Sequence, residues 1–118
     1  MTDTHEHLSR DTLDTVKDVM GDDFHLLIST FINDAGEHIE RLRAALARQD
    51  SDAARATAHS FKGSCHNLGA VHLAWLCEHV EQRSLEGNLD GLSDYLSQIE
   101  QEFTQVQRLL NEMVRGDG

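Results

Sequence analysis

Proline is absent from this 118-residue chain, and aromatic residues make up only 5% of it. Proline interrupts helices and aromatic residues favour strands, so their scarcity favours a helical protein. No stretch approaches the roughly 20 consecutive apolar residues that a membrane-spanning helix needs. Residues 1–7 contain neither a basic leader nor an apolar segment. We therefore expect a helical, cytoplasmic protein with no membrane partner.

Positive charge is also scarce. The chain has 10 Lys and Arg residues and 21 Asp and Glu residues, which gives a net charge of −11. Such a balance opposes binding to nucleic acid or to an anionic membrane surface. The two cysteines, Cys65 and Cys77, form no C-x-x-C pair and both fall on apolar faces. We expect them to be reduced thiols in the core.

Apolar residues recur at steps of three and four through most of the chain, which predicts amphipathic helices. A short helix follows Ser9, a suitable N-cap, and ends at Gly21. Asp22 is the predicted cap of a long second helix that ends near Gln49.

Three more helices follow. The third opens at Asp50 or Ser51 and runs to Leu68, and the fourth spans residues 71–86. The fifth has the clearest periodicity, because its apolar residues alternate steps of four and three without a break. They are Leu92, Leu96, Ile99, Phe103, Val106, Leu110 and Met113.

This spacing with short connections predicts an all-α fold: an antiparallel, up-down four-helix bundle with a short additional N-terminal helix. The predicted domain covers residues 9–114. Residues 1–8 are predicted to be a disordered N-terminus, and residues 115–118 a polar tail.

The third helix carries a candidate reactive group. At about 100° per residue, His59, Gly63 and His66 share one face, with Arg55 and Lys62 beside them. This face is opposite the apolar one, so the histidine is predicted to point outward. Glycine inside a helix costs about 1 kcal/mol of stability relative to alanine. The simplest reason for a glycine at position 63 is steric access to the imidazole of His59. An exposed nucleophilic nitrogen with a nearby cation suits phosphoryl transfer.

Three segments share a pattern with a known family. They are His59-x-x-Lys62-Gly63-Ser64, Asn67-Leu68-Gly69-Ala70 and Leu73-x-x-Leu76-Cys77-x-x-Val80-Glu81. The pattern closely resembles the histidine-containing phosphotransfer (HPt) domain of multistep bacterial phosphorelays, and the likeness covers roughly residues 9–112.

The resemblance implies that His59 accepts a phosphoryl group at Nε2 from a receiver-domain aspartyl-phosphate of a hybrid sensor histidine kinase. His59 then passes it to the aspartate of a response regulator receiver. Lys62 would stabilise the phosphoryl oxygens, and Gly63 would leave access. The resemblance implies Mg²⁺ on the partner receiver and no cofactor on this chain. We expect a monomeric, free-standing shuttle without kinase activity of its own.

Other residues are weaker candidates. Related domains often place a glutamine on the neighbouring helix, hydrogen-bonded toward the imidazole or phosphoryl group. Here the candidates are Glu78 and His79, although a plain surface role for His79 stays open.

Ser64 and Asn67 flank the apolar face and are expected to make hydrogen bonds within or between helices. Arg55 and His66 are candidates for docking a partner, or are simply solvated. The helical phase leaves Trp75 undecided between core and docking surface.

Eight histidines raise the question of a metal site. His59 and His66 are seven residues apart, as are His72 and His79, which separates their backbones by ~10 Å. We therefore predict no metal site. The alternative hypothesis for the function is a non-catalytic helical interaction module that uses the same face. Phosphorylation of His59 by a phosphorylated receiver would separate the two hypotheses.

Overall fold

The computed structural model describes residues 7–115, which form five α-helices and one 3-10 turn. The helices are α1 (Arg10–Met20), α2 (Phe24–Ala47), α3 (Ser51–Asn67), α4 (Val71–Leu85) and α5 (Leu92–Arg115), and the turn η1 (Gly21–Asp23) joins α1 to α2. The remaining terminal residues, 1–6 and 116–118, lie outside the described part. Much of the predicted N-terminus and C-terminal tail therefore falls outside the described residues.

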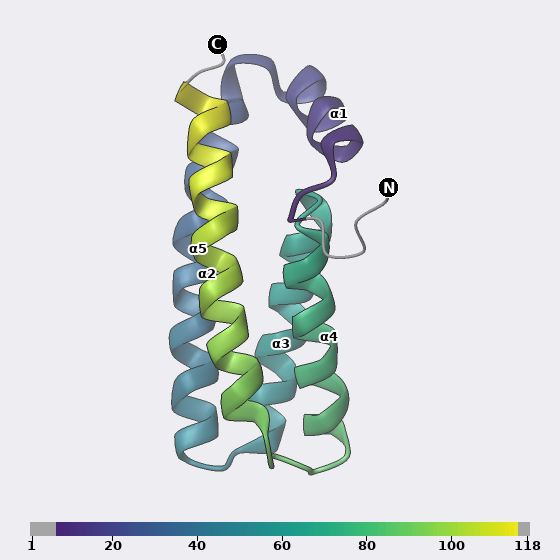
Figure 1. Cartoon of the computed structure of the whole chain (residues 1–118), viewed down its shortest axis with the longest axis vertical. Coiled ribbons are helices and arrows are strands. Elements are labelled where there is room, and N and C mark those ends of the chain that lie inside the picture. The colour runs from purple at the N-terminus through teal and green to yellow at the C-terminus, as the bar shows by residue number, and fades with distance from the viewer. Residues whose placement is uncertain (1–6, 116–118) are drawn as a thin grey trace.

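Helices α2 to α5 run up and down as an antiparallel bundle in which each packs against its neighbours in the chain, and α5 returns to pack against α2 (Figure 1). This confirms the predicted four-helix bundle with an additional N-terminal helix. The described molecule measures 44 × 32 × 20 Å.

The bundle helices differ in length, and α1 compensates for the difference. Helices α2 and α5 have 24 residues each, whereas α3 has 17 and α4 has 15. At 1.5 Å per residue, the helices of the longer pair exceed those of the shorter pair by about 10–14 Å. Helix α1 lies over the end of α3 and α4 (Figure 1) and buries Leu13 there. The Ser9 N–H donates to the Gly69 carbonyl at 2.7 Å, which attaches α1 to the α3–α4 connection.

The core is apolar and follows the predicted periodicity. In α5, Leu92, Ile99, Val106 and Leu110 are almost fully buried. The other three residues of the predicted series are partly buried against the same core. Cys65 and Cys77 are both free and buried, as predicted.

Two of the three predicted N-cap residues cap a helix in the structure. Ser9 Oγ accepts from the Thr12 N–H, and Asp50 Oδ1 accepts from the Ala53 N–H. The prediction for Asp22 is wrong, because this residue lies inside η1 and α2 begins at Phe24. The Phe24 N–H donates to the Gly21 carbonyl. The backbone turn thus satisfies a donor that a side-chain cap would otherwise serve.

The described structure includes residues just outside the predicted domain limits, 9 and 114. Leu8 packs against the core, and His7 Nδ1 lies 2.7 Å from the buried Glu102 carboxylate. Arg115 is the last residue of α5.

Candidate phosphoacceptor site

His59 lies on the outer face of α3 and exposes 66% of its side chain. The core-facing residues of the same helix, Ala54, Ala58, Phe61 and Cys65, are fully buried. Packing of these four side chains fixes the rotation of α3, and this rotation places His59 at the surface.

The imidazole is held from α4. His59 Nδ1 lies 2.9 Å from Glu81 Oε2. No residue of the described range bonds to the second ring nitrogen, Nε2. The hydrogen bond to Glu81 therefore occupies one nitrogen and leaves the other accessible to a reactant.

Lys62 is the cation nearest to this pair. Its Nζ forms an ion pair with Glu81 Oε1 at 2.8 Å, so one carboxylate contacts both Lys62 and His59 through different oxygens. Lys62 exposes 22% of its side chain and Glu81 only 16%. Burial alone would raise the pKa of Glu81, but hydrogen bonds from Lys62 and His59 outweigh it and lower that pKa. The hydrogen bond to Glu81 raises the pKa of Lys62. Both groups therefore stay charged at neutral pH.

Gly63 lies one turn after His59 on the same face. A Cβ atom added at this position would meet no atom of the protein within 4 Å. The chain itself thus has no packing requirement for glycine here. The free space is available to a group bound to the imidazole or to a second protein.

Glu81 is the contact that the sequence did not predict. The predicted candidates lie elsewhere: Glu78 is exposed, and the ring of His79 packs between Trp75 at 4.2 Å and Tyr95 at 5.5 Å. Glu81 could have been found from the hairpin, because positions 59 and 81 are equally far from Ala70 in the α3–α4 connection. In an antiparallel pair such positions lie opposite each other.

The remaining candidates lie around this centre. Arg55 is one turn before His59 and half-buried, and His66 is exposed in the last turn of α3. Ser64 and Asn67 face α2, where they line a groove of about 110 Å³. Trp75 exposes 49% of its surface and stacks on His72, so it is not a core residue.

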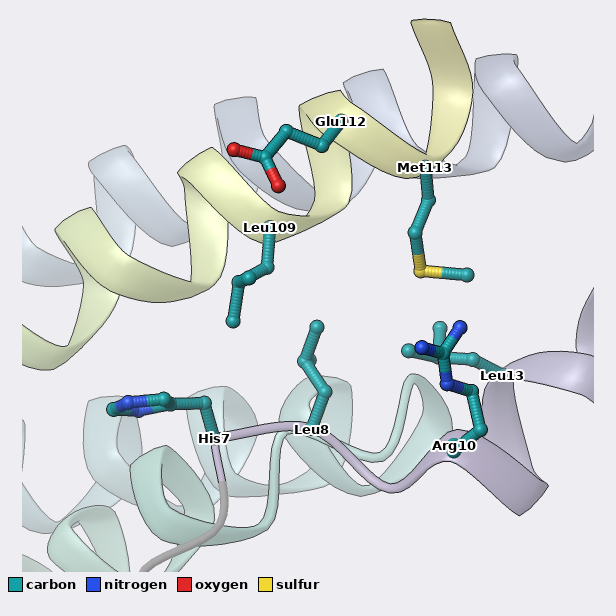
Figure 2. A pocket seen from close by; sticks show the side chains of 7 residues that line it. All are labelled: His7, Leu8, Arg10, Leu13, Leu109, Glu112 and Met113. Atoms are coloured by element: carbon teal, nitrogen blue, oxygen red, sulfur yellow. The ribbon is translucent and has the colours of Figure 1, made fainter. Parts of the chain in front are cut away.

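A larger pocket, of about 360 Å³, lies elsewhere, between the N-terminal segment and α5. Figure 2 shows Leu8 and Leu109 facing each other across it. His59 does not line this pocket, so the candidate site is a surface position rather than a cavity.

Neither a metal-binding cluster nor a membrane-spanning helix is found in the part of the chain that the structure describes. Between residues 7 and 115, no group of three or more His, Cys, Asp or Glu side chains is arranged to hold a metal ion. Within the same range, no helix combines the length and apolarity needed to cross a membrane.

Comparisons with known proteins agree with this geometry. Residues 26–109 match the sequence model of the Hpt domain family. The crystal structure of histidine-containing phosphotransfer protein B (HptB) from Pseudomonas aeruginosa PAO1 is 38% identical, with a TM-score of 0.89, over 91% of this chain and 93% of that one. The histidine-containing phosphotransfer protein ZmHP2 from maize, 23% identical over 92% of this chain and 90% of its own, shares the fold with a TM-score of 0.82. No curated protein matches the chain. The family match and the similarity to HptB show that this chain belongs to the Hpt domain family.

Proposed function

We propose that this protein is a phosphorelay intermediate in which His59 accepts a phosphoryl group from a receiver-domain aspartyl-phosphate and passes it to another receiver. The observation that carries the proposal is the state of the His59 ring. Its Nδ1 is occupied by Glu81, its Nε2 has no partner among the described residues, and the side chain is 66% exposed. A nucleophilic nitrogen at the surface suits a reaction whose other half is supplied by a second protein.

The proposed reaction is an in-line displacement at phosphorus. The Nε2 lone pair forms the N–P bond as the bond between phosphorus and the aspartyl oxygen breaks, and the electron pair leaves with the aspartate. Return to a second receiver reverses these roles. The Mg²⁺ that phosphoryl transfer requires would belong to the receiver domain.

Lys62 and Gly63 support this reaction in different ways. The Lys62 ammonium is charged and lies within one turn of His59, where it can stabilise the developing charge on the phosphoryl oxygens. The open space at Gly63 lets the receiver approach Nε2. The half-buried Arg55 and the exposed His66 on the same helix are proposed contacts for the receiver surface, with Ser64 and Asn67 at its α2 edge.

The test is incubation with a phosphorylated receiver domain and Mg²⁺, followed by analysis for an acid-labile label. We expect label on the wild type and none on His59→Gln. His25→Gln is the matched control, because it replaces an exposed histidine on a different helix, α2, and should keep the label. Label that persists in His59→Gln would contradict the assignment of His59. No label on the wild type would favour the non-catalytic interaction module.

A further inference from the structure

Helix α5 extends past its neighbour α4 at one end of the bundle. A short connection joins the two helices, but α5 has 24 residues and α4 only 15, so the last turns of α5 have no part of α4 beside them. Residues 7–9 and the start of α1 lie opposite these turns instead, and the two parts line a pocket of about 360 Å³ (Figure 2). The pocket exists because the N-terminal segment fills only part of the space that the shorter helix leaves.

Apolar side chains form most of the wall of this pocket. They are Leu8 and Leu13 on the N-terminal side and Leu109 and Met113 on α5. The two α5 residues are four positions apart, so they lie on one side of the helix, and Figure 2 shows both directed toward the N-terminal segment. Leu13 is buried, whereas the other three are only partly buried and keep apolar surface in contact with water. Binding of an apolar group would remove this surface from water, which is favourable.

The volume of the pocket sets the size of the ligand. An engineered apolar cavity of about 150 Å³ in another protein binds one benzene molecule. On the same scale, 360 Å³ holds a molecule roughly twice as large, with about 12 non-hydrogen atoms. This volume is near the lower limit of about 300 Å³ for ligand pockets. The pocket therefore suits a small molecule rather than a segment of a folded protein.

Arg10 supplies the charge that this pocket can offer to a ligand. The other ionisable groups of the wall are already paired. His7 Nδ1 lies 2.7 Å from the Glu102 carboxylate. Glu112 forms an ion pair with Arg108 at 3.4 Å. Among residues 7–115, no carboxylate forms an ion pair with Arg10. A bound anion would therefore meet a cation that has no competing partner in the described part of the chain.

We propose that the pocket binds a straight-chain aliphatic carboxylate of about ten carbon atoms. The chain lies between Leu8 and Leu109, and the carboxylate accepts hydrogen bonds from the Arg10 guanidinium, whose fork of N–H groups fits a carboxylate. Figure 2 shows the Arg10 side chain directed toward Met113, so the cation and the apolar wall are adjacent. His59 does not line this pocket, and the inference is independent of the proposed function.

Charge argues against two other occupants of the pocket. A second copy of this chain would bring another net charge of −11 to the interface, and like charges repel. A cationic amphiphile would be attracted by the acidic protein as a whole but would meet the Arg10 guanidinium at this pocket. The net charge disfavours an anion elsewhere on the surface, so binding of an anion here depends on Arg10 and the apolar wall together.

The test is a titration of the ¹⁵N-labelled protein with sodium decanoate, which has the proposed length, followed through the backbone amide chemical shifts in NMR. We expect saturable shifts confined to residues 7–13 and the last turns of α5, at concentrations below those at which decanoate forms micelles. Acetate carries the same charge without the chain and should cause no such shifts. His59→Gln should bind decanoate as the wild type does, because residue 59 is not part of the pocket.

Two substitutions separate the contribution of the charge from that of the apolar wall. Arg10→Gln removes the cation at an exposed position and should raise the Kd for decanoate about fivefold or more. Met113→Gln keeps the length of the side chain but makes the wall polar, and should raise the Kd by a similar factor. Arg41→Gln is the matched control, since it removes an exposed arginine of α2 that does not line the pocket, and should leave the Kd unchanged. Circular dichroism before the titration shows whether each variant is folded.

Several results would overturn the inference. Decanoate shifts that are absent, or that spread over other exposed apolar residues such as Leu26 and Trp75, would show that the pocket is not the site. Equal shifts with acetate, or equal weakening in Arg41→Gln and Arg10→Gln, would reduce the effect to general charge. An unchanged Kd in Arg10→Gln would contradict the choice of a carboxylate. Shifts of the same residues with protein concentration alone would assign the pocket to a second copy. None of these results involves phosphorylation, so the proposed function would stand or fall separately.

Discussion

At the scale of single residues, the site separates steric access from charge. Gly63 contributes empty space, whereas Glu81 and Lys62 form an ion pair that also holds the His59 ring. The two contributions are made by different residues, although Gly63 and Lys62 are neighbours on α3. Substitutions can therefore change one and leave the other intact.

Gly63→Ala should make the protein more stable and the transfer slower. An added Cβ meets no atom within 4 Å, so the variant gains helix propensity, up to about 1 kcal/mol, without a clash. A receiver that approaches Nε2 closely would meet the new methyl group. We expect phosphorylation of His59 to be slower by about tenfold or more. A tenfold decrease corresponds to about 1.4 kcal/mol in the activation free energy. Urea unfolding and single-turnover transfer measure the two effects.

Gly36→Ala provides the control for that experiment. Gly36 is also a helical glycine whose added Cβ would meet nothing within 4 Å, but it belongs to α2. The gain in stability should be similar and the transfer rate unchanged. Equal transfer rates in both variants and the wild type would show that the space at Gly63 has no role in access.

His38 should make the stability of the protein depend on pH. Burial lowers the pKa of His38 below its usual value, and its Nδ1 is buried without a hydrogen-bond partner in the described structure. As the pH falls below about 6.5, His38 becomes protonated in the unfolded chain before it does so in the folded protein. Stability should therefore fall with decreasing pH until the folded-state pKa is reached. His38→Leu should weaken this dependence, as measured by urea unfolding at several pH values.

At the scale of helices, the accuracy of the sequence prediction depended on how local the determining interactions are. The burial of Leu92, Ile99 and Val106 could be predicted because a helix places residues three and four apart on one face. The contact between His59 and Glu81 could not be read in this way, because it depends on the register of α3 against α4. The prediction for Asp22 failed for a different reason, because acidic residues are favoured both at N-caps and in turns. In the structure Asp22 lies in the 3-10 turn.

The connection between α3 and α4 also fixes α1. Gly69 has a φ of +73°, and a Cβ at this position would lie 2.9 Å from the Thr12 Cβ and 3.1 Å from the Ser9 Cβ. Gly69→Ala should therefore lose about 1–2 kcal/mol from the left-handed backbone and at least about 1 kcal/mol more from the clash with α1. The measurement is the free energy of unfolding in urea.

Gly87→Ala separates these two costs. Gly87 has a φ of +74°, but a Cβ there would meet nothing within 4 Å. The free energy of unfolding of Gly87→Ala should therefore fall only by the contribution from the left-handed backbone. If Gly69→Ala is no less stable than Gly87→Ala, the close packing of α1 on the α3–α4 connection does not contribute to stability.

At the scale of the whole molecule, the core is almost entirely apolar and the proposed chemistry lies outside it. Among the described residues, only Ser84 and Glu102 are buried polar or charged residues, and Glu102 is bonded to His7. The bundle therefore serves as a rigid support that presents one face of α3 and α4. This arrangement explains why the candidate site is formed by residues at the surface of two adjacent helices.

The two buried thiols report whether this support unfolds as one unit. Cys65 on α3 and Cys77 on α4 are both 0% exposed, and burial raises the pKa of Cys65, so reactive thiolate is scarce in the folded protein. Labelling by iodoacetamide should require opening of the core and be about a thousandfold or more slower than in the unfolded chain. Gln101→Cys, at an exposed position of α5, should label at once and serves as the positive control. Mass spectrometry should show both native thiols becoming labelled together, at the urea concentration where helical circular dichroism is lost. If one thiol labels well before the other, α3 and α4 open separately, and the bundle is not a single cooperative unit.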